Sequence, residues 1–158
     1  MVKLSYSVVS YRSEHASAWR SLNEGWIIEA GFAIEAKDRR VLADAEGEVL
    51  ERGGHIFIVE SETGEPVGCV SLMPMNDGGF ELAKMAIDPK ARGAGLAHLL
   101  MKACVERATK LGASRLYLET NSQLAPALSL YEAHGFEYLP LQDTPYVRAD
   151  VFMEKRLG

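Results

Sequence analysis

The spacing of apolar residues predicts one strand and two helices in the first third of the chain. Residues 6–11 have the composition of a short strand, and apolar positions at helical spacing follow as far as Gly25. A second helical pattern starts near Asp38 and stops at the glycine pair 53–54. Beyond these glycines the apolar period becomes that of a strand.

The middle of the chain has the two-residue period of strands. Residues 56–60 and 67–73 are predicted strands, and the Gly and Pro of the turn at 63–66 favour a hairpin between them. After a second turn comes a longer strand over residues 80–87, which the Asp-Pro pair at 88–89 stops. We therefore expect this part of the chain to be sheet.

The second half combines one long amphipathic helix with shorter elements. Between residues 96 and 111 apolar side chains recur every three or four positions, as on one buried helix face, and Gly112 is a natural stop. The remaining elements are predicted as strand, helix, strand and strand over residues 115–119, 126–134, 135–139 and 147–155. The order β-α-α-β-β-β-α-β-α-β-β predicts a mixed α/β layer rather than a strictly alternating doubly wound sheet.

Composition and charge narrow the classes of function. The 158 residues are 47% apolar and 25% charged, without repeats or low-complexity tracts, so we expect a single domain over residues 1–158. The 17 Lys and Arg against 22 Asp and Glu give a net charge of -5, the wrong sign for a protein whose main partner is nucleic acid or anionic lipid. An anionic ligand must therefore be bound by a local site.

Cysteine usage and apolar runs predict a cytoplasmic protein. Cys69 and Cys104 lie within apolar runs, without metal-ligand spacing, and are interpreted as core residues in a reducing compartment. The N-terminus lacks the apolar segment of a signal peptide, and no run approaches the roughly 18 residues of a membrane span. No metal site is expected. The histidines are interpreted as structural, namely His15, His55, His98 and His134.

A glycine-rich turn, Arg-Gly-Ala-Gly-Leu-Ala at residues 92–97, opens the long helix. Its glycines let the backbone approach a ligand, and the helix presents N–H groups at the positive end of its dipole. Arg92 adds charge-assisted donors, so the turn is suited to phosphate. A Walker loop is excluded because no Gly-Lys-Ser/Thr follows, and His98 occupies the third small position of a dinucleotide fingerprint. A helix start that only requires small residues stays an alternative.

Residues 81–89 and 92–97 together resemble the acetyl-CoA motif of the GNAT superfamily of N-acetyltransferases. That motif reads Arg/Gln-x-x-Gly-x-Gly/Ala, and Arg92, Gly95 and Ala97 occupy its three fixed positions. The resemblance implies that the turn binds the CoA pyrophosphate.

A second motif adds to this resemblance. Residues 127–136 are similar to the family signature Ala-x-x-Leu-Tyr-x-x-x-Gly-Phe and follow the first motif in the family's order. The strong match covers residues 80 to 140, and the order of elements extends it more weakly over the chain. The resemblance implies an α/β fold with a central mixed, mostly antiparallel sheet flanked by helices.

The resemblance also implies acetyl-CoA as cosubstrate, with its pantetheine arm along the strand at 80–87. Regular alternation would place Glu81, Ala83, Met85 and Ile87 on one face of this strand and Leu82, Lys84 and Ala86 on the other. Leu124 stands where many members carry Asn, and Asn121 is the nearby candidate for that contact. The residues assigned to the cofactor are Met85, Ala86, Ile87, Arg92, Gly93, Ala94, Gly95, Leu96, Ala97, Asn121, Ala127 and Tyr131.

Two side chains are candidates for proton transfer. An alkyl amine is mostly protonated at neutral pH, so a base must remove a proton, and Glu81 matches the general base of the histone-acetyltransferase branch. The alternatives for Glu81 are that it binds the substrate ammonium or a water, or that it is a solvated charge at the end of the strand. Tyr131 matches the tyrosine that protonates the departing thiolate, and a packed aromatic is its alternative. No Cys or Ser has a nucleophile context, which favours direct attack in a ternary complex.

The acceptor is expected to be a primary amine on a small molecule, an amino acid, a polyamine or a protein. Acidic and aromatic residues of the first two helices suit a cation, unless they are core and surface residues. Arg148, close to Tyr146 and Asp150, is a candidate for a carboxylate, with a surface charge as the alternative. The acceptor candidates are Trp26, Glu29, Glu35 and Arg148. The rival function is a noncatalytic acyl-CoA sensor, and a homodimer stays open.

Overall fold

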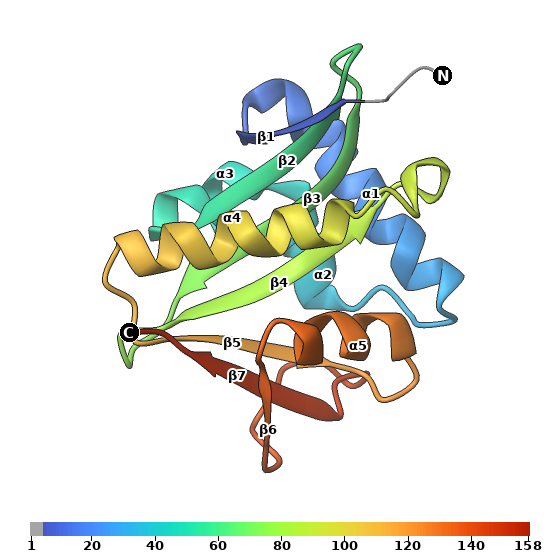
Figure 1. Cartoon of the computed structure of the whole chain (residues 1–158). Coiled ribbons are helices and arrows are strands. Elements are labelled where there is room, and N and C mark those ends of the chain that lie inside the picture. The colour runs from blue at the N-terminus through green and yellow to red at the C-terminus, as the bar shows by residue number, and fades with distance from the viewer. Residues whose placement is uncertain (1–4) are drawn as a thin grey trace.

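A seven-stranded sheet of order β1-β2-β3-β4-β5-β7-β6 runs through the computed structural model, which describes residues 5–158 (Figure 1). The strands are β1 (Tyr6–Ser10), β2 (His55–Ser61), β3 (Pro66–Pro74), β4 (Phe80–Ile87), β5 (Arg115–Thr120), β6 (Glu137–Leu139) and β7 (Val151–Arg156). Within the described residues, β4 and β5 are parallel and every other neighbouring pair is antiparallel. The predicted mixed, mostly antiparallel sheet is confirmed.

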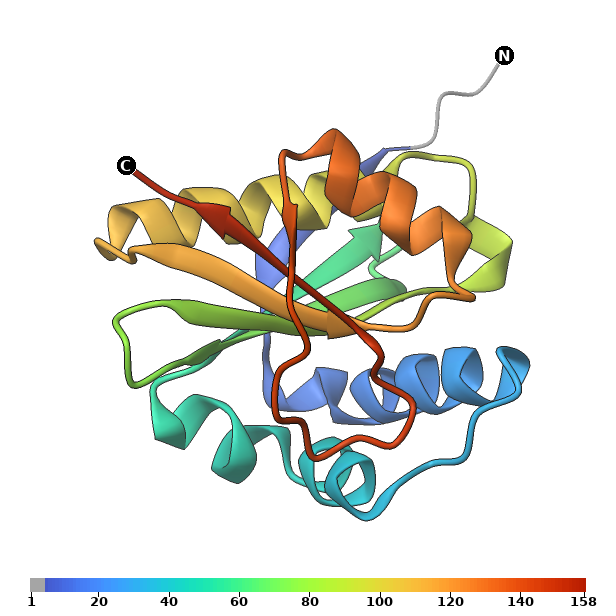
Figure 2. The same cartoon turned by 90° about the horizontal axis from the view of Figure 1, so that it is seen from below.

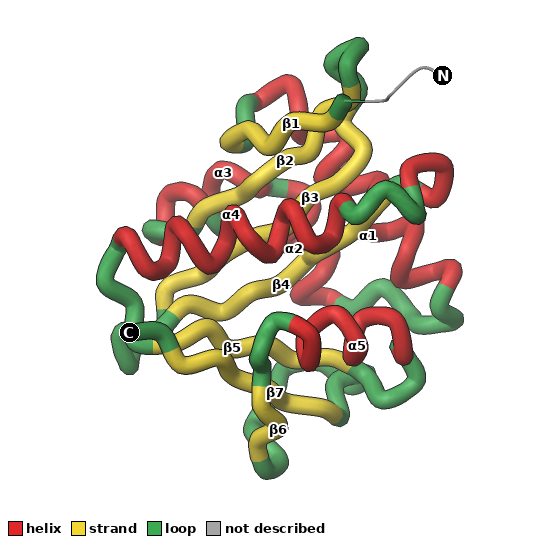
Figure 3. Tube along the Cα trace, viewed as in Figure 1, coloured by secondary structure: helices red, strands yellow, loops and turns green. Residues whose placement is uncertain are grey.

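Helices cover both faces of this sheet. They are α1 (Ala16–Glu29), α2 (Ala36–Ala43), α3 (Ala45–Glu48), α4 (Leu96–Lys110) and α5 (Ala125–Ala133). Figure 2 shows α4 and α5 on one face and α1, α2 and α3 on the other. The tube in Figure 3 shows the same arrangement, with α4 lying across the central strands. The resulting three layers bury the apolar sides of both helix groups against one sheet.

Each face of the sheet has its own apolar core. Leu72, Leu100 and Leu116 belong to the core under α4 and α5. Trp19 and Ile58 belong to the core under α1, α2 and α3. The interior of β2 and β3 is almost entirely buried, which explains their nearly continuous apolar sequences.

The cysteines belong to these two cores. Cys104 lies on the buried side of α4, Cys69 belongs to the core on the opposite side of the sheet, and both are buried, unpaired thiols. Burial raises the pKa of the Cys69 thiol to about 12. Both cysteines are therefore packing residues with unreactive thiols, as their apolar sequence context predicts.

The first two helices differ from their predicted extents. The helix α1 continues through Gly25 to Glu29. Gly25 does not end it, because Ile27 beyond this glycine is a buried side chain of the same helix. The second predicted helix is divided at Asp44, which has φ -145 and ψ 74, outside the helical region. The Asp44 carboxylate accepts a 2.9 Å hydrogen bond from the Gly47 N–H and thereby starts α3.

The last strand is shorter than predicted, because its N-terminal residues bond elsewhere. It begins at Val151 rather than at Val147. The Val147 N–H donates to Glu35 at 3.0 Å, and the Arg148 guanidinium bonds Asp38. Residues 140–150 are thus a loop that reaches back to α2, a contact that no local pattern encodes.

The predicted regular alternation of β4 is wrong beyond Ala83, because the strand contains a β-bulge. Ser71 pairs with Ala83, but Cys69 pairs with Ala86, so β4 has one extra residue in this interval. Lys84 accommodates it with φ 59, the one positive φ of a residue other than glycine within residues 5–158.

The bulge exchanges the two faces of β4. Leu82 and Met85 both contact the core under α4, whereas Ala86 belongs to the opposite core. Glu81, next to Leu82, is therefore on the same side as Lys84.

Among the described residues, no helix is long and apolar enough to cross a membrane.

Candidate active site

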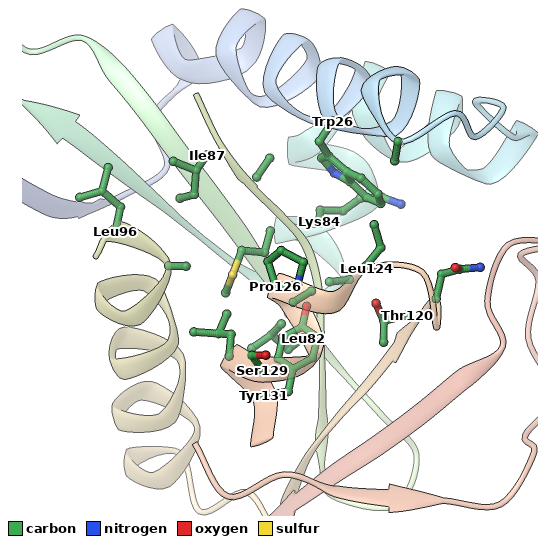
Figure 4. Close-up of a pocket in the computed structure, with 18 of the residues that line it drawn as sticks. Trp26, Leu82, Lys84, Ile87, Leu96, Thr120, Leu124, Pro126, Ser129 and Tyr131 are labelled. Atoms are coloured by element: carbon green, nitrogen blue, oxygen red, sulfur yellow. The ribbon is translucent and has the colours of Figure 1, made fainter. Parts of the chain in front are cut away.

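A cavity of about 910 Å³ opens where β4 and β5 separate. These strands pair only at Phe80 with Leu116 and at Glu81 with Tyr117. Beyond these pairs they diverge, and the start of α4, the end of α1 and the helix α5 complete the walls (Figures 1 and 4). The unpaired edge of β4 thus faces an open channel instead of another strand.

The glycine-rich turn forms one end of this cavity. Gly93 and Gly95 have φ 88 and 75, a left-handed conformation that favours glycine. The N–H groups of Gly93, Ala94 and Gly95 donate to no protein acceptor within residues 5–158. The first N–H groups of α4 have no intrahelical acceptor either. This concentration of free donors at the positive end of a helix dipole fits a pyrophosphate.

Arg92 lies beside this turn and is paired with Glu29. Two hydrogen bonds of 2.9 and 3.1 Å join the guanidinium to both carboxylate oxygens. The hydrogen bond from Arg92 keeps the pKa of Glu29 below its usual range. Both side chains are about half exposed, at 51% and 53%, so the pair is accessible to an incoming anion.

Glu81 is the accessible carboxylate in the middle of the cavity. It has no hydrogen-bond partner among residues 5–158, and it lines the cavity wall. Burial raises its pKa, repulsion from Glu119 raises it further, and the nearby Lys37 and Lys84 oppose the shift. A carboxylate with a raised pKa and open access is suited to accept a proton.

Glu119 faces the same space from β5, but both of its oxygens are engaged. The Tyr117 hydroxyl donates to one at 2.9 Å, and the Thr144 hydroxyl donates to the other at 2.6 Å. Glu119 is consequently held in place and acts on Glu81 through its charge.

Tyr131 closes the cavity from α5. Its side chain is buried, and burial raises its pKa to about 12. The hydroxyl has no hydrogen-bond partner within the described part of the chain, and the ring lies below Pro126 in the view of Figure 4. Tyr131 and Leu82 belong to the same apolar core. A protonated phenol that is free to donate lies where the two walls meet.

A network centred on Asp38 forms the opposite wall. The carboxylate of Asp38 has no exposed surface and accepts from Lys84 Nζ at 2.7 Å and from Arg148 at 2.7 and 2.8 Å. Burial by itself would raise the pKa of Asp38, but the hydrogen bonds from Arg148 and Lys84 hold it well below its usual range. The Lys84 ammonium also donates to the Tyr146 hydroxyl at 2.8 Å.

Most of the residues that the sequence assigns to the site do line this cavity. Two of them, Ala94 and Glu35, are not part of its wall. Glu35 instead accepts from the Val147 N–H and lies 3.5 Å from Arg148. The predicted residues that line the cavity are Trp26, Glu29, Glu81, Met85, Ala86, Ile87, Arg92, Gly93, Gly95, Leu96, Ala97, Asn121, Ala127, Tyr131 and Arg148.

Sequence reasoning missed Lys84 and Glu119. A lysine inside the apolar strand at 80–87 was a signal for Lys84, because a buried lysine requires a partner. Glu119 gave no comparable signal. Asn121 bonds within the protein, donating to the Arg148 carbonyl at 2.7 Å.

Two histidine contacts also join distant parts of the chain. His98 Nδ1 and His134 Nε2 are 2.8 Å apart, so these residues are partners although their sequence positions gave no indication of it. His15 is buried, accepts from the Arg12 N–H at its Nδ1 and lies 2.9 Å from Glu60 through its Nε2. Both His15 ring nitrogens are thus occupied by the protein.

Comparison with known proteins identifies the class of this fold and site. Residues 15–136 match the acetyltransferase (GNAT) family. The uncharacterized N-acetyltransferase YjgM of Escherichia coli is 36% identical over 115 residues, which cover 70% of this chain and 69% of that protein. The chain therefore belongs to the GNAT family, and it is an enzyme of the N-acetyltransferase class.

Solved structures share the fold. A GNAT-family acetyltransferase from Staphylococcus aureus has a TM-score of 0.88 at 18% identity, covering 98% of this chain and 100% of that chain. The phosphinothricin acetyltransferase of Sinorhizobium meliloti, solved in complex with AcCoA, has a TM-score of 0.80 at 16% identity, covering 97% and 89%. At these low identities, the similarities show a shared fold.

The Asp38 network predicts a large loss of stability on Asp38→Asn. Removing the charge leaves Lys84 and Arg148 without their buried counterion, which costs about 3–5 kcal/mol. Urea unfolding at neutral pH measures the loss. Arg20→Gln, which breaks the exposed pair with Glu24, is the control and should leave the unfolding midpoint unchanged. Equal midpoints for Asp38→Asn and wild type would contradict the assigned role.

The stability that the Asp38 carboxylate contributes should also depend on pH. Because the folded-state pKa of Asp38 is lowered, its stabilisation is present at neutral pH and is lost as pH falls. The difference between wild type and Asp38→Asn should therefore shrink below about pH 4, where Asp38 becomes protonated in the unfolded chain. A difference that is constant from pH 7 to pH 3 would show that the carboxylate charge does not cause it.

Proposed function

We propose that this protein transfers an acetyl group from acetyl-CoA to a primary amine by direct attack within a ternary complex. The supporting observation is the channel between β4 and β5, with free N–H donors at the turn and the unpartnered Glu81 further along. The end of the channel at the glycine-rich turn can bind an anionic phosphate, and the carboxylate in its middle can accept a proton. These are the two requirements of acetyl transfer from a CoA thioester to a protonated amine.

The CoA moiety is assigned to the turn and to β4. The N–H groups of residues 93–97 and the guanidinium of Arg92 would hold the pyrophosphate. The main chain of Met85, Ala86 and Ile87 would bond the pantetheine amides, because the edge of β4 toward β5 has no strand partner there. Asn121 and Ala127 border the same channel on its far side.

Glu81 and Tyr131 are assigned the two proton transfers. The thioester supplies the acetyl group, the amine nitrogen forms the new bond to the carbonyl carbon, and the bond to sulfur breaks. Glu81 takes the proton from the ammonium, for which its raised pKa is suited. Tyr131 gives a proton to the departing sulfur, and its raised pKa keeps it protonated until then. The nitrogen loses its second proton after it has bonded to the carbonyl carbon, and this proton restores the Tyr131 hydroxyl.

The acceptor is assigned to the part of the cavity between Glu81 and α1. Trp26 lines this part, and its ring lies 5.7 Å from the Arg148 guanidinium. Glu29 and Glu35 are paired with groups of the protein, so neither is an open ammonium site. Glu81 is therefore the carboxylate that first meets the amine.

Arg92→Ala should weaken binding of CoA about tenfold, because charge-assisted hydrogen bonds to the pyrophosphate are lost. Calorimetric titration with CoA gives the dissociation constant. Glu29→Gln is the matched control: it removes the competing carboxylate of the same ion pair and should not weaken binding. An unchanged dissociation constant for Arg92→Ala would show that Arg92 does not bind the phosphate and would contradict the assignment of the pyrophosphate to this turn.

Glu81→Gln should lower kcat about 10²-fold and change the pH profile. Because burial raises the pKa of Glu81, the wild-type kcat/KM should fall on acidification at a pH above the usual glutamate value of about 4.3. Thiol release from acetyl-CoA, followed against pH, measures both effects. Glu62→Gln, in the exposed turn after β2, is the control. Retention of the acidic limb in Glu81→Gln would assign the base to another group.

Tyr131→Phe should lower kcat about 10²-fold and leave the KM for acetyl-CoA nearly unchanged, because only the proton donor is lost. The same thiol-release assay applies. Tyr138→Phe makes the identical chemical change on an exposed residue of β6 and should retain activity. If both variants retained wild-type kcat, the proton donor would not be Tyr131.

A further inference from the structure

Two hydrogen-bond donors in the cavity wall have no protein acceptor. The ammonium of Lys84 has three N–H groups, of which one bonds Asp38 and one bonds the Tyr146 hydroxyl. Because Lys84 cannot accept, the Tyr146 O–H is itself still available as a donor. Neither the third N–H of Lys84 nor the O–H of Tyr146 has an acceptor within residues 5–158, and both residues line the cavity.

The protein holds these donors in fixed positions. Lys84 stands at the bulge of β4, and Asp38 restrains its side chain from α2. The Tyr146 ring is flanked by cations, with the Arg148 guanidinium 4.5 Å and Lys37 Nζ 5.3 Å from its centroid. Trp26, Lys84 and Tyr131 all line the cavity, and in the view of Figure 4 Tyr131 lies further from α1 than the other two. The two donors are therefore preorganised for a ligand.

Charged groups of both signs surround these two donors. The cations are Lys37, Lys84 and Arg148, and the carboxylates near them are Asp38, Glu35, Glu81 and Glu119. The fork of Arg148 is already directed at both oxygens of Asp38. Arg148 thus positions the loop, and Lys84 has the donor that remains for a ligand.

Two carboxylates lie close to Lys84 on the same side of β4. The bulge places Lys84 on the side of Glu81, three positions along the strand. Glu81 has open oxygens, and Glu119 adds a second negative charge beside it. A ligand that spans this part of the cavity thus meets an acid at one end and a cation with a phenol at the other.

We propose that Lys84 and Tyr146 bind a carboxylate of the amine acceptor, so that the substrate is an amino acid whose amino group faces Glu81. The inference rests on the proposed acetyl transfer and adds the class of acceptor. It also assigns the carboxylate contact to Lys84 and Tyr146, whereas the sequence suggested Arg148. The reaction is otherwise unchanged: the amino nitrogen gains the acetyl group, loses one proton to Glu81 before it attacks, and loses the second to Tyr131 once Tyr131 has protonated the sulfur.

Matched pairs of acceptors test this assignment. Each free amino acid is compared with its decarboxylated amine, which has the same side chain and amine but no carboxylate. With wild-type enzyme and acetyl-CoA, the kcat/KM for the accepted amino acid should exceed that of its amine about tenfold or more. Product masses confirm that the nitrogen is acetylated.

Two variants place the effect on the proposed residues. Lys84→Met and Tyr146→Phe should bring the ratio of the two kcat/KM values toward one, through a loss for the amino acid and little change for the amine. Tyr146→Phe keeps the ring and its cation contacts, so it tests the hydroxyl even if Lys84→Met fails to fold. Lys110→Met makes the same chemical change at an exposed lysine at the end of α4, away from the cavity, and should keep the wild-type ratio.

The outcomes separate the two proposals. Amines acetylated as well as their amino acids, or variants that lower both substrates equally, would overturn the carboxylate contact and leave acetyl transfer standing. If no amine and no amino acid raised thiol release while acetyl-CoA still bound, acetyl transfer itself would be wrong, and the carboxylate contact with it. A ratio that is high in wild type and lost in both variants would support both.

Discussion

The separation of β4 from β5 is the constraint on which the rest of the site depends. Two residue pairs join these strands, and beyond them the backbone of β4 has no partner on that side. Unpaired main-chain groups in a protein interior are costly unless water or a ligand bonds them. The resulting channel connects the N–H groups of the glycine-rich turn with Glu81 and Tyr131. A fully paired sheet would have left no space between them.

The β-bulge at Lys84 gives this channel its chemistry. Without the extra residue, the side chains beyond Ala83 would face the opposite layers. With it, Met85 packs under α4 while Lys84 points to Asp38 on α2. Asp38 then gathers Lys84 and Arg148, and through Arg148 it holds the loop at 140–150 against the helices. The charge of one buried carboxylate thereby links three segments that are distant in sequence.

Apolar periodicity predicted most of the fold. Every predicted strand has a counterpart, and the long helix ends where Gly112 indicates, because these elements depend on local spacing and local stops. The errors arose where tertiary contacts override local patterns. The helix α1 continues through Gly25, Asp44 divides the second helix by its own hydrogen bond, and Val147 bonds Glu35 instead of joining a strand.

The sequence by itself determined the family motifs, and with them the turn at 92–97, Glu81 and Tyr131 as candidates. These features depend on residue types at fixed short spacings, which can be read along the chain. Only the tertiary structure decided which charges are free. Arg92, Glu29, Glu35 and Arg148 all have partners inside the protein, whereas Glu81, Lys84 and Tyr146 keep unused hydrogen-bonding capacity toward the cavity. Pairing depends on distances between segments far apart in sequence, and folding alone sets those distances.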